Sequence, residues 1–287
     1  MTKAHLSGRL RPGILVAAMV ALSSSHGAAN AATEADAVTL APHRAIYDLK
    51  LAKAHGKRSI EGVRGRILYD FSGSPCEGYS LQFRQVSELD TGEGKVAVSD
   101  LRAATWEDGK AGGLRFNSQN FLDDQLSESV DGRAERHPDD VAISLTKPQE
   151  KSFKIAADVV FPTEHVRRAI TAARAGKSIL EFQVYDGSES GEKIYNSLTV
   201  IGQPIPPEKT PNDAASKAGQ LTGLTRWPVT ISYFDKSSGT GEQTPVYAIT
   251  FELYENGVSR ALVLDYGDFA ISGTMTSLEM RESPPCK

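Results

Sequence analysis

The sequence predicts a mostly β protein: a single-domain, curved antiparallel sheet that forms a barrel or an open half-barrel packed round one amphipathic helix. Three observations lead to this fold class. Segment after segment alternates polar and apolar residues, which is the two-residue period of a half-buried strand. Turn-forming residues separate these segments. Near the middle of the chain, one segment has the helical spacing of apolar residues instead.

The first 31 residues have the three parts of a secretory signal peptide. Lys3, Arg9 and Arg11 precede the apolar run 14–22 (ILVAAMVAL), and Ala29-Asn30-Ala31 is a small-residue cleavage site. As a helix this run spans only about 14 Å, against a hydrocarbon core of about 30 Å, so a signal peptide is favoured over an uncleaved membrane anchor. A lipoprotein is disfavoured because no cysteine lies near the cleavage site. We therefore expect residues 1–31 to be removed and residues 32–287 to form one exported domain without a transmembrane segment.

A series of strands is expected before the helix. The clearest is 43–51, in which Ala45, Tyr47 and Leu49 share one face. The others are 66–71, 79–88, 95–106, 113–120, 125–131, 134–137, 141–145 and 151–156. Turns are expected at Asp108-Gly109, at Asp131-Gly132 and at 138–140 (PDD).

The helix is expected to begin at Thr163, which can cap its first turn, and to end at Gly176. Its apolar face has the spacing i, i+3, i+4, i+7 and consists of Val166, Ala169, Ile170 and Ala173. The opposite face is basic and consists of Arg167, Arg168, Arg174 and Lys177. Such a face could dock an acidic partner or lipid headgroups, but a solvated face is the favoured interpretation.

Strands are expected again after the helix, at 179–185, 193–201, 228–235, 246–254, 258–266 and 269–280. Asn256-Gly257 between two of them predicts a type I′ hairpin. The segment 203–223 contains four prolines and little apolar pattern, and we interpret it as a long loop within one domain. An open barrel of this size often encloses an apolar cavity, unless the helix fills it.

The charge balance argues against some partners. The whole chain has a formal charge of −4, and removal of residues 1–31 leaves 29 basic and 36 acidic side chains, a charge of −7. A net acidic surface repels phosphates and anionic headgroups at long range. We therefore expect neither nucleic-acid binding nor non-specific membrane binding.

The chain has two cysteines, Cys76 and the penultimate residue Cys286. In an exported protein a structural disulfide is the favoured interpretation. Two free thiols, a redox pair or a metal site are the alternatives, although neither cysteine has a partner at C-x-x-C spacing. Closing so long a loop would stabilise the fold by up to roughly 5 kcal/mol.

A search for catalytic patterns indicates no enzyme. After signal removal four histidines remain, His43, His55, His137 and His165, and none has metal-ligand spacing. The serines of 187–191 (GSESG) do not form a nucleophile elbow, and the pairs Asp123-Asp124 and Asp139-Asp140 suit solvated turns. We expect no catalytic residues, no metal and no cofactor. The alternative is an envelope hydrolase or transferase whose catalytic site is dispersed along the chain.

Several segments resemble a known family. They are 40–49 (LAPHRAIYDL), 65–70 (GRILYD) with Cys76 soon after, 227–229 (WPV), and the strand-rich tail that closes at Cys286. On these segments the mature chain, almost in full, resembles the EipB-type cell envelope integrity proteins of alphaproteobacteria.

The resemblance implies a periplasmic, single-domain β-spiral or open half-barrel with one helix, a cup-like groove and one disulfide, at Cys76 and Cys286. It also implies support of envelope integrity under stress and a functional link to a periplasmic tetratricopeptide-repeat protein. No catalytic residues carry over. The concave sheet is similar to that of lipoprotein carriers, an analogy of fold alone. We therefore expect a non-enzymatic protein that binds a partner protein or a lipid or other apolar ligand in its concave sheet.

Overall fold

The computed structural model describes residues 38–54, 60–92, 94–236 and 244–286. The expected signal peptide, residues 1–31, and His55 lie outside these ranges. The unit that begins at Val38 is treated by itself below.

One antiparallel sheet of fourteen strands forms almost the whole unit, in the order β8-β7-β6-β5-β4-β3-β2-β1-β14-β13-β12-β11-β10-β9. The strands are β1 His43–Ala54, β2 Gly62–Ser74, β3 Gly78–Asp90, β4 Val96–Glu107, β5 Gly113–Leu122, β6 Gln125–Arg136, β7 Asp140–Lys147, β8 Lys151–Ala156, β9 Ile179–Val184, β10 Tyr195–Ile201, β11 Arg226–Asp235, β12 Tyr247–Tyr254, β13 Ser259–Asp265 and β14 Phe269–Met280. The predicted fold class is confirmed: the sheet is strongly curved and not closed into a barrel.

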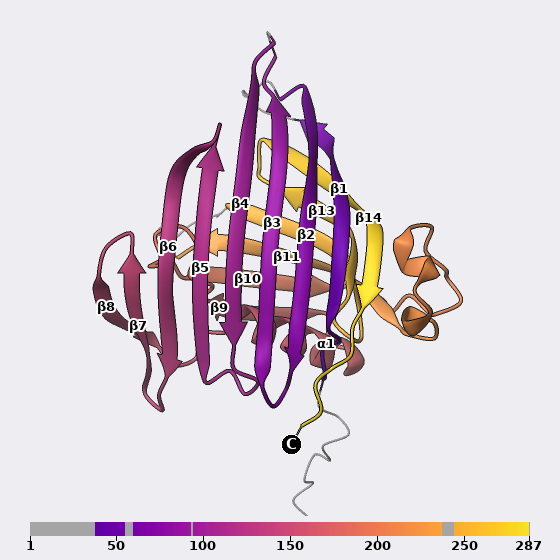
Figure 1. Ribbon diagram of the computed structural model, residues 1–287. Coiled ribbons are helices and arrows are strands. Elements are labelled where there is room, and N and C mark those ends of the chain that lie inside the picture. The colour runs from indigo at the N-terminus through magenta and orange to yellow at the C-terminus, as the bar shows by residue number, and fades with distance from the viewer. Residues whose placement is uncertain (1–37, 55–59, 93, 237–243, 287) are drawn as a thin grey trace, which may run out of the picture. The chain divides into compact units, whose positions relative to one another are not determined.

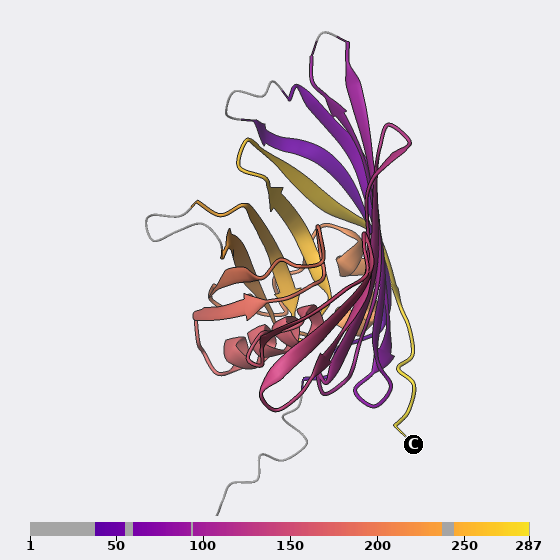
Figure 2. The same ribbon diagram turned by 90° about the vertical axis from the view of Figure 1, so that its left-hand side faces the viewer.

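The first and last strands join two arms of the sheet. We call β1–β8 the N-terminal arm and β9–β14 the C-terminal arm. β1 pairs with β14 from His43 opposite Met280 to Ala54 opposite Phe269. The two arms face each other, with helix α1 (Pro162–Arg174) between them at one end (Figures 1 and 2). Val160, in the connection between β8 and α1, forms a single bridge with Val184 of β9, the edge strand of the C-terminal arm.

The core lies on the inner face of both arms, as the alternation predicts. Along β1, His43, Ala45, Tyr47 and Leu49 are buried, whereas the residues between them are more exposed. The main cluster spans β1–β3, α1 and β10–β14, and a smaller one, with Phe116 and Ile143, lies under β5–β8. Burial of these apolar side chains holds the curved sheet to the helix.

The expected turn at Asp131-Gly132 is wrong, because β6 runs through it. A register shift occurs there instead: Asp131 lies opposite Lys147 and Gly132 opposite Leu145. A Cβ atom on Gly132 would lie 2.8 Å from side-chain atoms of both Leu145 and Phe116. The glycine therefore permits close packing at a β-bulge and does not end a strand.

Helix α1 is capped by a residue distant in sequence, not by Thr163. The helix begins at Pro162, so Thr163 lies inside its first turn. The carboxylate of Glu107, at the end of β4, accepts the backbone N–H groups of Thr163 and Glu164 at 2.7 Å each. Burial raises the pKa of Glu107 to about 7, although both N–H donors and the charge of Arg167 oppose this rise. Glu107 thus fixes the helix N-terminus to the N-terminal arm.

The predicted loop 203–223 follows β10 and contains two short 3-10 helices, Ala214–Lys217 and Gly219–Leu221. Asp213 at the start of the first one forms an ion pair of 2.7 Å with Arg260 of β13, and both side chains are buried. Glu252 of β12 also contacts Arg260. The loop is therefore held against the C-terminal arm.

The structure joins Cys76 and Cys286 in a disulfide, with the two Cα atoms 5.6 Å apart and 210 positions between them in sequence. Cys76 lies in the turn between β2 and β3, and Cys286 lies in the tail that follows β14. The same tail is held by an ion pair between Arg281 and Asp70 of β2, and the Arg281 N–H donates to Pro42 O at 2.9 Å. The tail thus lies beside the seam between β1 and β14.

Replacing Cys286 with Ser is expected to lower the free energy of unfolding by about 2–5 kcal/mol, because the unfolded chain regains the entropy of an open loop. Urea and thermal unfolding measure the change, and limited proteolysis should release the tail sooner. Cys76→Ser should match it, and a reductant should destabilise only the wild-type protein. Equal stability of all three proteins under non-reducing conditions would contradict this account.

Replacing Glu107 with Ala should lower the unfolding free energy by roughly 3 kcal/mol, because the buried N–H group of Glu164 and the partly buried one of Thr163 lose their acceptor. Urea unfolding at neutral pH measures the loss. Glu88→Ala is the matched control, since Glu88 pairs with Arg64 on the exposed face of β3 and should cost no more than about 1 kcal/mol. Similar losses in both variants would show that the Glu107 cap contributes little.

Candidate functional site

An apolar cavity of about 180 Å³ lies between the two arms. The N-terminal arm contributes side chains of β1, β2 and β3, and the C-terminal arm contributes side chains of β12 and β13. The lining residues are His43, Tyr47, Ile67, Tyr69, Phe83, Gln85, Tyr247, Ile249, Phe251, Gly257, Ser259, Leu262 and Leu264. Apart from His43, Gln85, Gly257 and Ser259, all of them are aromatic or aliphatic.

Alternation along each strand places these residues on the inner face. Phe83 and Gln85 are two positions apart on β3, and Tyr247, Ile249 and Phe251 repeat the spacing on β12. The intervening residues face outward: Thr250, for example, forms a hydrogen bond of 2.9 Å with Thr230 on the exposed side of β12. The inner face is therefore continuous from one arm to the other.

A row of contacting aromatic rings crosses the C-terminal arm from this cavity. We call Tyr195, Tyr233, Tyr247, Tyr266 and Phe269 the aromatic track. Successive ring centroids are 6.1, 6.1, 5.2 and 5.2 Å apart. Rings at such distances pack favourably while they keep a broad apolar surface. Tyr266 is 38% exposed, so the track runs from the interior to solvent.

The cavity carries no charge at neutral pH. Burial raises the pKa of Tyr69 to about 12 and the pKa of Tyr47 and Tyr247 further, so these phenols stay protonated. Burial also lowers the pKa of His43, whose Nδ1 lies 2.8 Å from Ala41 O. The Tyr47 hydroxyl is occupied, since it donates to Ser259 O at 2.7 Å. Such a cavity suits an uncharged apolar group.

Two polar side chains meet beside the cavity. Burial raises the pKa of Tyr266, which follows β13, and the neighbouring Gln85 side chain on the N-terminal arm opposes this rise. Gln85 also lies 3.3 Å from the hydroxyl of Ser87. The apolar interior is therefore bordered by groups that can donate and accept hydrogen bonds.

The other histidines considered from the sequence lie apart from one another. His165 is buried in α1, and its Nε2 lies 2.8 Å from the Thr199 hydroxyl. Its ring also meets the Phe182 ring edge-on at 5.4 Å. His137 is exposed, in the turn before β7. Within the described part of the chain, no three His, Cys, Asp or Glu residues are grouped to hold a metal ion.

The acidic pairs and the serine-containing turn lie in strand connections. Asp123 and Asp124 form the turn between β5 and β6, with φ angles of 49° and 61°. Asp139 precedes β7, and Asp140 begins it and pairs with Lys154 of β8. Ser188 and Ser190 lie between β9 and β10. None of these residues lines the cavity.

The basic side chains of α1 form more contacts with the protein than a solvated face would. Arg167 is half-buried and donates to Gly109 O at 2.6 Å. Arg168 pairs with Glu164 at 2.6 Å, and Arg174 donates to Glu255 O at 3.3 Å. The expectation of a solvated face is wrong for Arg167 in particular, because its guanidinium ties α1 to the turn after β4.

Apart from His43, Tyr47 and Gly257, the residues that line the cavity were not named among the residues of interest in the sequence. Alternation shows that Tyr69 and Phe71 share a face, as do Phe83 and Gln85. It does not show that the faces of β2 and β3 meet those of β12 and β13, about 180 residues away. The signal that could have pointed to the cavity is the alternation of aromatic residues, which occurs on strands near both ends of the chain.

Comparison with known proteins places the chain in a family. A family model described as EipB-like matches residues 34–282. The chain belongs to the EipB-like family. The cell envelope integrity protein EipB of Brucella abortus (strain 2308) is 37% identical to this EipB-like chain over 257 residues, 90% of each protein. That relative is named for envelope integrity, not for an enzymatic activity.

The fold of the EipB-like chain also matches a solved structure. A crystal structure from Brucella abortus, titled a β-barrel-like protein of a domain of unknown function, superimposes with a TM-score of 0.79 at 36% identity. The match covers 86% of this chain and all of that one. Among the helices that the structure describes, none has the length and apolar character to cross a bilayer.

Stability is expected to fall as the pH falls from about 6.5 to about 4, because burial lowers the pKa of His165 to about 4 while it is 6.5 in a free side chain. The unfolded chain then binds a proton that the folded chain does not, at a cost of roughly 3 kcal/mol. Urea unfolding at several pH values measures this slope. His165→Gln should reduce it, whereas His137→Gln, on the surface, should not. An unchanged slope in His165→Gln would refute this assignment.

Proposed function

We propose that this EipB-like protein supports the integrity of the cell envelope by holding an apolar ligand, of the acyl-chain type, in the cavity between its two arms. The uncharged aromatic lining carries the proposal. A buried charge would be costly there, whereas each buried methylene group contributes about 0.8 kcal/mol. The envelope role is supported by family membership and by the name of the Brucella relative.

The size of the cavity limits what it holds. A volume of about 180 Å³ corresponds to about six groups of the size of water. A longer chain would therefore extend from the cavity along the aromatic track, over Tyr247 and Tyr266. Its polar end would then lie near Gln85. In this proposal the ligand is an amphiphile with one inserted chain.

The remaining parts of the proposal concern location and partners. We propose that residues 1–31 are a signal peptide that is cleaved, that residues 32–287 are one periplasmic domain, and that the Cys76–Cys286 disulfide forms there. The spacing of the basic, apolar and small residues supports export. A periplasmic tetratricopeptide-repeat protein is the proposed functional partner, on the family resemblance alone. The proposed action is binding, without catalysis.

Ile249→Trp should weaken binding of the neutral apolar dye N-phenyl-1-naphthylamine by about tenfold or more, because the larger side chain fills the cavity. Dye fluorescence measures the affinity. Thr250→Trp is the matched control: it adds the same group to the outer side of β12 and should leave the affinity unchanged. Mass spectrometry of lipid that co-purifies from the periplasm identifies the natural ligand. Equal dye affinity in both variants, or no binding, would overturn the proposal.

A further inference from the structure

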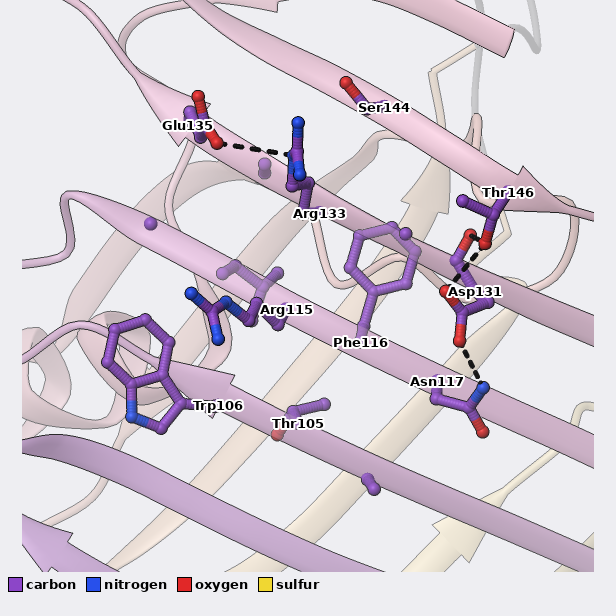
Figure 3. Close-up of a pocket in the computed structure, with 15 residues that line it drawn as sticks. Thr105, Trp106, Arg115, Phe116, Asn117, Asp131, Arg133, Glu135, Ser144 and Thr146 are labelled. Atoms are coloured by element: carbon purple, nitrogen blue, oxygen red, sulfur yellow. Dashed lines mark hydrogen bonds and ion pairs between the residues drawn. The ribbon is translucent and has the colours of Figure 1, made fainter. Parts of the chain in front are cut away.

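A second and larger hollow lies on the outer face of the N-terminal arm, on the side away from the apolar cavity. We call it the outer trough. Its volume is about 670 Å³, and it is lined by residues of β4, β5, β6 and β7 (Figure 3). Ligand sites commonly have volumes of about 300–1,000 Å³. Its side chains alternate with the buried ones on the same strands: Arg115 and Asn117, for example, flank Phe116 of the core.

A fixed row of polar groups crosses three strands of the trough. The Asn117 amide donates to one carboxylate oxygen of Asp131 at 2.6 Å, and the Thr146 hydroxyl donates to the other at 2.7 Å (Figure 3). These two bonds lower the pKa of Asp131, so it is ionised at neutral pH. A carboxylate has about four lone-pair sites, and these bonds use two of them. Asp131 can therefore accept further hydrogen bonds from a ligand.

The charges of the trough cancel. Arg115 and Arg133 are its basic residues, and Asp131 and Glu135 are its acidic ones. Arg133 lies 3.3 Å from Glu135, whereas the guanidinium of Arg115 lies over the ring of Trp106 at 5.2 Å. This balance disfavours a polyanion, which would need an excess of basic side chains. It suits an uncharged ligand that both donates and accepts hydrogen bonds.

Trp106 forms an apolar wall at one end of this polar surface. Its ring packs on the backbone of Gly78, where a Cβ atom would approach the ring to 2.8 Å. Its indole N–H donates to Glu77 O at 3.2 Å. The ring is thus held in one orientation by the turn between β2 and β3. Movement of the exposed Arg115 side chain would open the ring face to a ligand.

We propose that the outer trough binds an uncharged saccharide chain. Adjacent sugar hydroxyls require donors and acceptors side by side, which Asp131, Asn117 and Arg115 supply. The C–H face of a sugar ring packs on an aromatic ring, which Trp106 supplies. The volume corresponds to roughly twenty water-sized groups, which is about two sugar rings. Asp131, Asn117 and Trp106 lie on strands and are held by the hydrogen bonds described above, so these groups are in place before binding, and only Arg115 has to move.

The test is titration with chitotetraose, the β-1,4-linked tetramer of N-acetylglucosamine, followed by calorimetry and by tryptophan fluorescence. The chain has two tryptophans, and the other, Trp227, is buried in the core. We expect saturable binding, a fluorescence change that Trp106→Phe removes, and affinity at least about tenfold lower in Asp131→Ala. Arg64→Ala is the control, since Arg64 lies exposed on β2 outside the trough.

Each outcome distinguishes the trough from the cavity. Asp131→Ala should bind N-phenyl-1-naphthylamine as the wild-type protein does, and Ile249→Trp should keep its affinity for chitotetraose. Circular dichroism of Asp131→Ala shows whether the variant is folded, and Asn117→Ala provides an independent loss of one hydrogen-bonding group. Absence of saturable binding to wild-type protein, or equal affinity in Asp131→Ala, Asn117→Ala and Arg64→Ala, would overturn the saccharide proposal and leave the cavity proposal intact.

Discussion

The pairing of the first strand with the last is the interaction on which the rest of the structure depends. β1 and β14 are joined over their full length, from His43 opposite Met280 to Ala54 opposite Phe269. Each arm alone is a run of sequential hairpins with one apolar face open to water. The seam makes them one curved sheet whose apolar faces meet, and the cavity exists only because they do. The Cys76–Cys286 disulfide and the Arg281–Asp70 ion pair both lie beside this seam.

Helix α1 lies between the two arms at one end, and polar and charged residues hold it there. Glu107 of β4 caps its first turn, Arg167 binds the turn after β4, and His165 contacts Thr199 of β10. The helix is thereby bonded to both arms. Burial opposes the charged form of Glu107 and of His165 alike, but only the carboxylate receives compensating hydrogen bonds from the helix N-terminus. The helix therefore links the two arms through hydrogen bonds as well as through apolar packing.

The elements could be predicted from the sequence because their signals are local. Two-residue alternation located the strands, and the spacing from Val166 to Ala173 located the helix. Local signals gave wrong predictions at two positions. Gly132 suggested a turn, although the glycine is needed for close packing within a strand. Thr163 was expected to cap the helix, but Glu107, 56 residues away, accepts the N–H groups of the first turn. An apolar cavity was expected from the fold class, but the residues that line it, and the outer trough, could not be predicted, because each combines one face of several strands. Which faces meet is decided by long-range pairing such as Tyr47 with Met275.

The seam also sets the order in which the chain can fold. The strands from β1 to β8 pair with their neighbours in sequence, so each hairpin can form without any later part of the chain. The second partner of β1 is β14, more than two hundred residues later in the sequence. Until β14 pairs with it, β1 has one unpaired edge and its apolar side chains are exposed. Folding that depends on such distant contacts is slow and open to aggregation. Without β14, the facing edges of both β1 and β13 would be unpaired, so truncation of that one strand would leave both arms open to aggregation.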